Sequence, residues 1–454
     1  MVDYRARGEG CELAVSHTDT ICAIATPPGM GGVGIVRISG PDVRTLARLT
    51  LKKDLKPRYA TLSAFLDEEG GLLDEGIALF FPGPQSFTGE DVLELQGHGS
   101  PVVLDRLLQA LVAHGARLAR PGEFTERAFL NGKIDLIQAE AVADLIESAH
   151  EASARAALNT LQGAFSTTIK GLQTRLSTLR VHVEADLDFP EESLAIENDH
   201  ALEASLQALR RDVKEARRLG REGRLLREGA QVVIAGAPNA GKSTLLNALC
   251  GHEAAIVHAK PGTTRDLVRE RIMIEGLALE LTDTAGLRES LDPVEAEGIR
   301  RARGLLDKAD CVLWLVDDGA PRATLVFENP VPTLIVFTKI DTTGRAPGAH
   351  EDGLAVSALT GAGLAPLRQA IRATILGGAD AGPEGSFTAR RRHVVALDRI
   401  DLTLAEALLR QGEGSPELVA EELRRAQEYL GEMTGEFTSD DLLGQIFADF
   451  CIGK

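Results

Sequence analysis

Residues 236–243 read Gly-Ala-Pro-Asn-Ala-Gly-Lys-Ser, and this octapeptide restricts the fold more than any other segment of the chain. It follows an apolar β-type run at 231–235 and precedes an apolar helical pattern that begins at Leu245. In that context the pattern is typical of a phosphate-binding loop. Its glycines let backbone N–H groups surround phosphates, Lys242 reaches the β- and γ-phosphates, and Ser243 ligates Mg²⁺. The octapeptide therefore predicts a nucleotide site in an α/β domain.

Two later segments fit the elements of such a site that contact metal and γ-phosphate. Gly262-Thr-Thr-Arg-Asp266 stands where a first switch is expected, and Thr264 there would complete the Mg²⁺ shell. Asp283-Thr-Ala-Gly286 ends a β-type run. Asp283 would be a carboxylate in the second coordination shell of the Mg²⁺, and the Gly286 N–H would reach the γ-phosphate.

Two further segments predict which base is bound. Thr338-Lys-Ile-Asp341 follows a β-type run and resembles a base-reading Asn-Lys-x-Asp element, and Ser357-Ala-Leu359 fits the last base-contacting loop. Asp341 can accept hydrogen bonds from the N1–H and amino group of guanine, whereas adenine offers no such pair. We therefore predict GTP over ATP. Threonine at 338 is shorter than the usual asparagine, which predicts reduced guanine affinity with specificity retained by Asp341.

The residue after Gly286 is Leu287, which cannot orient water as the glutamine of many small GTPases does. Arg265 and Arg288 are more consistent with a switch surface than with an arginine finger. The amide oxygen of Asn239 can instead help to coordinate a cation beside the phosphates. Glu295 is a candidate for orienting water, and an exposed glutamate at a helix start explains it equally well.

The chain length of 454 residues predicts about three domains. Residues 20–132 mix short β-type runs with turns, residues 231–377 alternate strands and helices, and the flanking regions are helical. We predict a multidomain fold: an α+β domain at 1–133, an all-α domain at 134–229 and 378–454, and an α/β P-loop GTPase domain at 230–377 inserted in it. Two separate helical domains are the alternative.

Several elements are predicted individually. Apolar residues recur every three or four positions from Leu158 to Val183, which predicts one long helix, and again from Val419 to Met433, with Ser415-Pro416 as helix start. In the N-terminal region a single helix is predicted at 102–112, among strands at 21–25, 34–38, 77–81 and 92–95. In the α/β region strands are predicted at 231–235, 277–283, 311–316 and 333–338.

Composition excludes some functions. The net charge of −18 argues against a surface that binds nucleic acid non-specifically, and the arginine clusters at 217–227 and 390–392 are interpreted as solvated helix faces. No apolar run reaches the ~18 residues of a membrane span, and residues 1–19 have no apolar signal segment. Five widely spaced cysteines predict free thiols in a reducing cytoplasm.

Motifs along nearly the whole chain resemble the tRNA-modification GTPase MnmE (TrmE) family. Those motifs are the phosphate loop, Gly262–Asp266, Asp283-Thr-Ala-Gly-Leu-Arg-Glu289, Ala25-Thr-Pro-Pro-Gly29, Gly31-Gly-Val-Gly34, Ser86-Phe-Thr-Gly-Glu-Asp91, Leu95-Gln-Gly-His98, Arg120-Pro-Gly-Glu-Phe124 and the terminal Cys451-Ile-Gly-Lys454.

The resemblance implies a GTPase activated by K⁺ and by juxtaposition of two G domains in a homodimer. Asn239 and the loop from His258 to Thr264 would bind K⁺, and Glu295 would orient water. The loop departs from the family's pattern at Lys260-Pro261, directly before Gly262. The nucleotide set is Asn239, Ala240, Gly241, Lys242, Ser243, Thr244, His258, Ala259, Lys260, Pro261, Gly262, Thr263, Thr264, Asp283, Thr284, Ala285, Gly286, Thr338, Lys339, Asp341, Ser357 and Ala358.

The resemblance to the family also implies that the N-terminal domain resembles folate-binding folds and binds a 5-formyl-tetrahydrofolate-type one-carbon carrier. By position, Arg37, Glu94, Lys133 and Lys454 would line that site. Cys451 would either add to the uridine ring as a thiolate or fix the tail. The family acts with the FAD-binding protein MnmG, here as a heterotetramer, on C5 of the tRNA wobble uridine.

Two other functions stay open at this point. A ribosome-assembly GTPase would share the G domain, although a basic RNA-binding module is not visible in the sequence. A non-catalytic, nucleotide-gated scaffold is compatible with Leu287. Hydrolysis measured in KCl and in NaCl would distinguish the scaffold from an enzyme.

Overall fold

The computed structural model describes residues 19–188, 195–251, 269–274, 277–283, 309–320, 331–376, 387–436, 440–448, 450 and 453. The chain divides into two compact units. The first is formed by Met1–Glu147, Thr160–Asp212 and Arg399–Lys454, and the second by Ser148–Asn159 and Val213–Asp398. Both are built from segments distant in sequence. The fold class is confirmed as an α+β region, a helical region and an inserted α/β region, while the domain boundaries stay a prediction.

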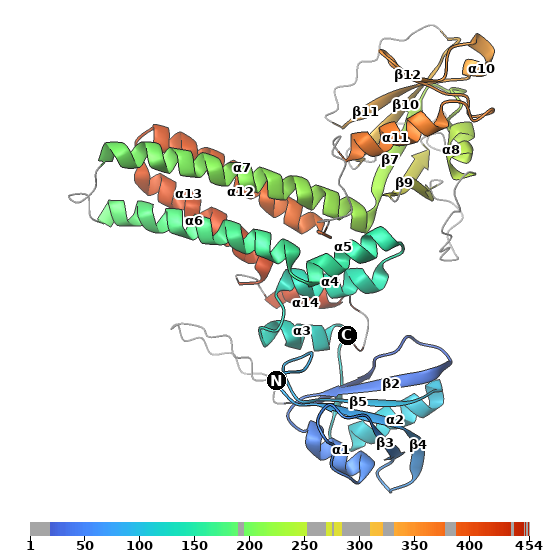
Figure 1. The fold of residues 1–454 in the computed structure, drawn as a ribbon, viewed down its shortest axis with the longest axis vertical. Coiled ribbons are helices and arrows are strands. Elements are labelled where there is room, and N and C mark those ends of the chain that lie inside the picture. Colours follow the sequence, from blue (N-terminus) through green and yellow to red (C-terminus); the bar gives the residue numbers. More distant parts are fainter. Residues whose placement is uncertain are drawn as a thin grey trace, which may run out of the picture. The chain divides into compact units, whose positions relative to one another are not determined.

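The first unit begins with a six-stranded sheet of order β3-β4-β5-β2-β1-β6. Its strands are β1 Ile21–Ile24, β2 Gly31–Ser39, β3 Thr61–Leu66, β4 Leu72–Phe81, β5 Val92–Gly99 and β6 Arg117–Leu118. All pairs are antiparallel except β1 with β6. One face packs on α1 (Val43–Leu51) and α2 (Pro101–Ala113), where alternate strand residues such as Val36, Ile38 and Leu95 are buried (Figure 1).

The prediction for this region was incomplete. The strands at 34–38 and 92–95 extend to Gly31–Ser39 and Val92–Gly99, and the strand at 77–81 begins at Leu72. Strand β3 and helix α1 were not predicted at all. The statement that a single helix interrupts the strands was therefore wrong. Nine residues of α1 are too few for a distinct periodic pattern.

Helix α3 (Glu123–Leu130) carries a buried ionic network. Arg127 is fully buried, and its guanidinium donates to Asp19 Oδ1 at 2.8 Å, to Glu90 at 3.2 Å and to Glu123 Oε1 at 3.2 Å. Glu123 is 1% exposed and also accepts from Arg117 at 2.6 Å. A buried charge needs partners to compensate its desolvation, and these carboxylates supply them.

The network makes the N-terminal domain sensitive to acid. Burial by itself raises the pKa of Glu123, but hydrogen bonds from Arg117 and the Arg120 N–H, with neighbouring guanidinium charges, lower it from 4.5 to about 2. The resulting stabilisation, about 3 kcal/mol, is present above pH ~4.5 and is lost as the pH falls towards 2. Calorimetry of wild type and Glu123→Gln should show a difference in unfolding free energy that is constant above pH ~5 and shrinks as the pH falls from ~4.5 towards ~2. A difference that stays constant over the whole range would contradict the assignment.

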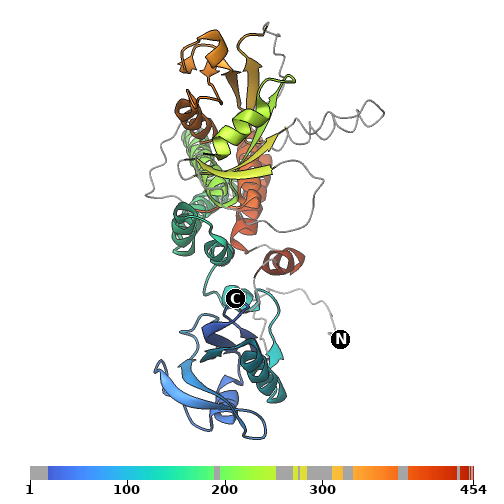
Figure 2. The same cartoon turned by 90° about the vertical axis from the view of Figure 1, so that its right-hand side faces the viewer.

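The helical region contains α4 (Leu136–Glu147), α5 (Glu151–Leu161), α6 (Ala164–Asp188), α7 (Ala195–Glu228), α12 (Arg391–Gly412), α13 (Pro416–Thr434) and α14 (Asp440–Ala448). Helices α6, α7, α12 and α13 run side by side in both views (Figures 1 and 2). The prediction of one long helix through 158–183 was wrong. Gly163 adopts a φ of 93° and separates α5 from α6, although Phe165, Ile169 and Leu176 do form the expected buried stripe.

Helix α13 confirms its predicted start and apolar stripe. Ser415 is the N-cap residue and Pro416 the first helical residue, but the Ser415 side chain makes no capping hydrogen bond. Val419, Leu423, Ala426, Leu430 and Met433 are all buried. Among the described helices, none has the length and apolar character needed to cross a bilayer.

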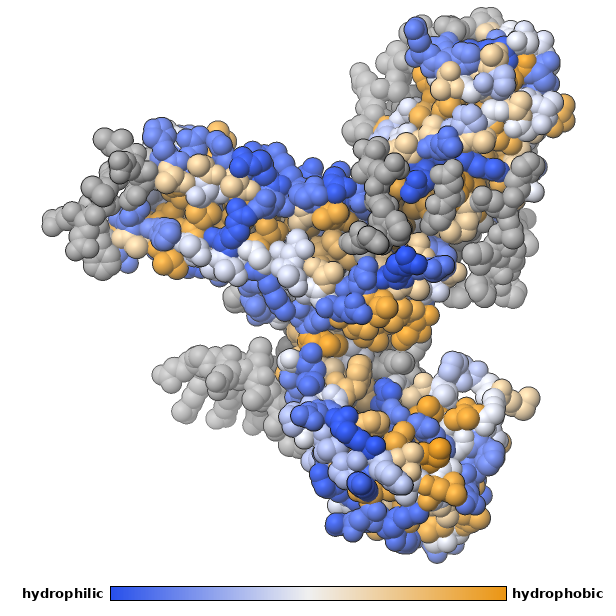
Figure 3. Space-filling view, in the orientation of Figure 1, coloured by the Kyte–Doolittle hydropathy of each residue, from blue (hydrophilic) through white to orange (hydrophobic). Residues whose placement is uncertain are grey.

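The arginines at the end of α7 are paired with carboxylates. Arg217 donates to Asp398 at 2.9 Å and Arg218 to Glu215 at 2.7 Å, while Arg224 forms an ion pair with Asp310. The hydrophilic colouring along α7 in Figure 3 agrees with this charge-rich composition. The interpretation as a solvated face therefore holds only for some of these arginines, because Arg224 is mostly buried against its partner.

The second unit contains a seven-stranded sheet of order β12-β13-β11-β10-β7-β9-β8. Its strands are β7 Ala230–Gly236, β8 Arg269–Ile274, β9 Leu277–Asp283, β10 Cys311–Asp317, β11 Thr333–Thr338, β12 Gly348–His350 and β13 Gly353–Ala355. Strands β9, β7, β10, β11 and β13 are parallel, and β8 and β12 are antiparallel edge strands. The four predicted strands are confirmed within one residue at each end, and β8, β12 and β13 were not predicted.

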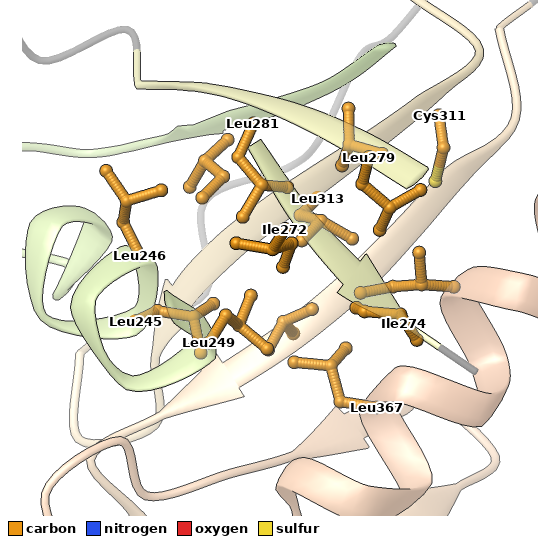
Figure 4. Close-up of a cluster of buried hydrophobic side chains, with 14 of the residues drawn as sticks. Leu245, Leu246, Leu249, Ile272, Ile274, Leu279, Leu281, Cys311, Leu313 and Leu367 are labelled. Atoms are coloured by element: carbon orange, nitrogen blue, oxygen red, sulfur yellow. The ribbon is translucent and has the colours of Figure 1, made fainter. Parts of the chain in front are cut away.

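The core of this sheet fixes the strand that precedes the phosphate loop. Helices α8 (Lys242–Cys250), α10 (Ile340–Thr343) and α11 (Leu364–Ile375) complete the domain. Leu245, Leu246 and Leu249 of α8 pack on the sheet beside Ile272 and Leu281 (Figure 4). The described thiols, Cys22, Cys250 and Cys311, are free, as predicted.

Gly229 is the single residue between α7 and β7, and its φ is 77°. A Cβ at Gly229 would lie 2.9 Å from the carbonyl oxygen of Ala278, so glycine is required for both conformation and space. Asp310, the partner of Arg224, also accepts from the Gln231 N–H at 2.9 Å. The end of α7 is thus tied to the first residues of β7 and β10.

Candidate functional site

The predicted nucleotide segments meet at one edge of the second sheet. The carboxyl ends of β7, β10 and β11 are Gly236, Asp317 and Thr338, and these strands are parallel neighbours. In the sheet β7 lies between β9 and β10: the chain runs from β7 to β8 and β9 on one side and then crosses to β10 on the other, which makes this point the switch in strand order. Ligands of open α/β sheets bind outside the carboxyl ends of strands at such a point.

The phosphate loop has the backbone that an anion site requires. Gly236, Asn239 and Gly241 have φ values of 148°, 63° and 86°. A Cβ at Gly236 would collide with the carbonyl oxygen of Leu315, so only glycine fits there. Lys242 donates from Nζ to the carbonyl oxygens of Ala237 at 2.9 Å and Gly236 at 3.2 Å, so its charge lies within the loop. N–H groups turned inward by such a loop form a nest for phosphate oxygens.

Thr338 connects the base-reading segment to the phosphate loop. Its hydroxyl, 3% exposed with the rest of the side chain, donates to the Ala240 carbonyl at 2.8 Å and lies 3.2 Å from the Val316 carbonyl. The Ala240 C=O and the Gly241 N–H belong to one trans peptide and point in opposite directions. Because the carbonyl points to Thr338, the Gly241 N–H points away from Thr338. The shorter side chain at 338 therefore makes a defined contact with the loop.

Removing this hydroxyl should weaken nucleotide binding. Thr338→Val keeps the shape but leaves the Ala240 carbonyl without this donor, a loss of about 1–3 kcal/mol, which corresponds to roughly 5- to 150-fold in affinity. The dissociation rate of a fluorescent GDP analogue measures this loss of affinity. Thr333→Val, at the exposed start of the same strand, is the matched control. Equal dissociation rates for both variants would contradict a role for the contact.

The base-reading segment is held by the residues around it. Ser357, which is 1% exposed, donates from Oγ to Asp341 Oδ1 at 2.5 Å. Lys339 forms an ion pair with Asp317 at 2.7 Å, and this hydrogen bond and charge lower the pKa of Asp317. Asp341 is exposed and oriented, as an acceptor for a base must be. Asp317 was not recognised in the sequence, because only its place at the end of β10 marks it.

The remaining candidates fall into two groups: some lie near the phosphate loop or the base-reading segment, and the others lie outside the described residues of the chain. Asp283 is the last residue of β9 and lies opposite Ile234 of β7, at the same edge as the phosphate loop. Ser243 and Thr244 are exposed in the first turn of α8, and Ala358 follows Ser357. The candidates outside the described residues are His258, Ala259, Lys260, Pro261, Gly262, Thr263, Thr264, Thr284, Ala285, Gly286, Glu295, Cys451 and Lys454.

In the N-terminal sheet, Arg37 and Glu94 form one unit. They are cross-strand neighbours on β2 and β5, and their side chains are joined at 2.9 Å. The guanidinium of Arg37 lies 5.6 Å from the ring centroid of Phe87 and 5.8 Å from that of Phe124. Lys133 donates to the Pro84 carbonyl at 2.9 Å. The three described candidates of this site thus meet around the loop that carries Phe87.

The C-terminal tail reaches the same strands. Gly453 has a φ of 91°, and a Cβ there would collide with the carbonyl oxygen of Ile24 and lie 2.9 Å from Cα of Ala25. Ile24 ends β1, in which Ala23 pairs with Arg37. The glycine of the terminal Cys-x-Gly-Lys is therefore needed for a close approach to the strand beside Arg37.

Replacing this glycine should release the tail. Gly453→Ala combines backbone strain with a clash, at about 1–3 kcal/mol, which raises the open population about tenfold or more. Carboxypeptidase B should then remove Lys454 from the variant at least ~10-fold faster than from wild type. Gly444→Ala in α14, whose Cβ meets no atom within 4 Å, is the control and should leave the rate unchanged. Equal rates for Gly453→Ala and wild type would show that the tail does not depend on this contact.

A lysine-bearing phosphate loop after β7 and a base-reading aspartate after β11 define the class of protein: a P-loop GTPase. The family model described as MnmE helical domain matches residues 136–451, and the one described as GTP-binding protein TrmE N-terminus matches residues 20–133. The chain belongs to the MnmE family of GTPases.

Curated relatives match almost end to end. The tRNA modification GTPase MnmE of Alkalilimnicola ehrlichii is 52% identical over 96% of this chain and 99% of the relative. That of Erwinia tasmaniensis is 50% identical over 97% of this chain and 100% of the relative. Among solved structures, the G domain of the T. maritima FeoB iron transporter matches with 27% identity over 33% of this chain and 99% of that chain, at a TM-score of 0.25.

Proposed function

We propose that this protein hydrolyses GTP to drive modification at C5 of the wobble uridine in tRNA, acting with an MnmG-type flavoprotein and a one-carbon folate. The observation that carries the proposal is identity of 50–52% over nearly the full length of relatives named tRNA modification GTPases. The oriented Asp341 and the Thr338 contact to the phosphate loop support guanine nucleotides as the ligand.

For hydrolysis, the described residues fit a metal-bound triphosphate. The ammonium of Lys242 lies within the phosphate loop, against the Gly236 and Ala237 carbonyls, and Ser243 stands in the first turn of α8, where its hydroxyl would hold Mg²⁺. K⁺ bound through Asn239 and the loop 258–264 would supply the positive charge that an arginine finger gives elsewhere. Glu295 would orient the water, since Leu287 cannot.

The salt dependence tests this proposed mechanism. Hydrolysis by wild type should be much faster in KCl than in NaCl, and Asn239→Ala should lose most of that difference. Asn247→Ala, an exposed asparagine on α8, is the matched control. Equal turnover of wild type in both salts would overturn the potassium proposal while leaving GTP binding intact.

For the carbon donor, the Arg37–Glu94 pair, with two aromatic rings within 6 Å of the Arg37 guanidinium, fits a folate. Glu94 can accept from the N–H donors of a pterin, and the guanidinium and the Lys133 ammonium retain donors for carboxylates. A 5-formyl-tetrahydrofolate-type carrier would supply the carbon. Lys454 would add a further charge, and Cys451 would either act as a thiolate nucleophile or fix the tail.

The assembly proposed is a homodimer that joins two MnmG-type subunits as a heterotetramer in the cytoplasm. The net charge of −18 and the paired arginines of α7 favour a partner that makes much of the tRNA contact, and they argue against a ribosome-assembly role. Nucleoside analysis of tRNA from cells lacking the protein tests the function. Loss of the wobble modification, restored by wild type but not by Lys242→Ala, supports it; an unchanged wobble base would refute it.

A further inference from the structure

Residues 82–91, here called loop 82–91, connect β4 to β5 and are held by side chains of α3 and the turn after it. Arg127 donates to both carboxylate oxygens of Glu90 at 3.2 Å. Asn131 donates from Nδ2 to the Thr88 carbonyl at 2.7 Å. Lys133 donates to the Pro84 carbonyl at 2.9 Å. Three side chains within seven residues thus fix the beginning, middle and end of one loop.

The middle of the loop is buried and its polar groups are connected. Thr88 and Ser39 are 0% exposed and their hydroxyl oxygens lie 2.7 Å apart, while Ser39 donates to Glu90 Oε2 at 2.7 Å. A Cβ at Gly89, whose φ is 83°, would lie 3.1 Å from Cβ of Asn131. The positive φ and the lack of space for a side chain together account for the glycine at this point of the loop.

Phe87 is the residue that this loop presents to the Arg37–Glu94 pair. It stands directly before the clamped Thr88, it is 38% exposed, and its ring lies 5.6 Å from the Arg37 guanidinium. Phe124 of α3 lies on the same guanidinium at 5.8 Å. Displacing Thr88 therefore moves one of the two rings that orient Arg37, without touching Arg37 itself.

We propose that Asn131 and Arg127 are positioning residues of the N-terminal site, which hold loop 82–91 so that Phe87 lies on the Arg37–Glu94 pair in the geometry that binds a one-carbon folate. The inference rests on the folate site proposed above. Neither residue needs to touch the ligand, because both act through Thr88 and Glu90 of the loop.

Asn131 gives the sharper test, because its position is exposed, whereas a change at buried Arg127 also lowers the stability of the domain. Asn131→Asp keeps the size and removes the donor to Thr88. Its Kd for 5-formyltetrahydrofolate, measured by calorimetry on the full chain, should rise about tenfold. Asn131→Gln keeps the donor on a longer side chain and should recover most of the affinity. Gln109→Ala is the control, because Gln109 is an exposed residue of α2 whose side chain bonds only locally, to Asp105.

Two further readouts separate positioning from a general structural effect. The double variant Phe87→Leu/Asn131→Asp should raise the folate Kd by less than the product of the two single fold-changes, because both substitutions act through the same ring. Without ligand, hydrogen exchange of the Gly83 and Glu90 amides should accelerate in Asn131→Asp, while α1 and α2 stay unchanged. If Asn131→Asp leaves both the amide exchange of the loop and the folate affinity unchanged, the inference about positioning fails, and the proposed folate function is unaffected. If wild type does not bind the folate although loop exchange responds, the folate role fails and the clamp on loop 82–91 stands.

Discussion

Asp341→Asn is expected to change the preferred base from guanine to xanthine. The carboxylate of Asp341 can accept two hydrogen bonds, which matches the N1–H and amino group of guanine. An amide presents one acceptor and one donor, and that matches the N1–H and C2 carbonyl of xanthine. Because a buried mismatched pair leaves polar groups unpaired, the preference for GTP over XTP should fall on the order of 10³-fold or more. Competition of GTP, XTP and ATP against a fluorescent nucleotide measures it.

The result depends on Ser357 holding Asp341 in place, since Ser357 Oγ lies 2.5 Å from Asp341 Oδ1. Asp352→Asn is the matched control, because that carboxylate pairs with Arg345 beside the β12–β13 turn and not at the base-reading edge. It should leave selectivity unchanged. An Asp341→Asn protein with full GTP selectivity would refute the assignment of the base-reading residue, even if hydrolysis continued.

Arg127→Met should have the largest effect on stability. Three carboxylates, Asp19, Glu90 and Glu123, share the Arg127 guanidinium, which is fully buried. Methionine fills similar volume but leaves these negative charges facing one another. Breaking a buried ionic network from one side costs about 3–5 kcal/mol. Urea unfolding of the N-terminal domain, followed in the full chain by pulse proteolysis, measures this loss.

Arg120→Met is the matched control for this change. Arg120 belongs to the same segment and pairs with Glu126 at 2.8 Å and, at 3.6 Å, with Glu123, but its side chain is 61% exposed. An exposed pair is worth about 0–1 kcal/mol, so the control should unfold nearly as wild type does. If the two variants differed by less than about 1 kcal/mol, the network would not hold the domain together.

The nucleotide site could be predicted because its information is local. The positive φ angles of Gly236 and Gly241 and the lysine that follows lie within a few residues, so the octapeptide itself specifies the loop. The same holds for the apolar stripe of α13. Thr338 shows the limit of such reasoning: the residue type predicted a lost contact, whereas its hydroxyl contacts Ala240, which lies 98 residues earlier in the chain.

The network around Arg127 could not be predicted, because its members are distant in sequence. Glu90 and Asp19 lie 37 and 108 residues from Arg127. The segments Ser86–Asp91 and Arg120–Phe124 were noticed as family motifs, yet no spacing rule connects them. Likewise a single glycine, Gly163, ended a helix that periodicity alone would have continued through Leu158 and Phe165.

The one-residue junction at Gly229 has a mechanical consequence. Helix α7 contains 34 residues, which corresponds to a rod of about 51 Å. Its end is bonded through Arg224 to Asp310, beside the strand that leads into the phosphate loop. Gly229 is the only residue between this helix end and β7, so a shift of β7 acts directly on the last turn of α7, with no loop between them to absorb it.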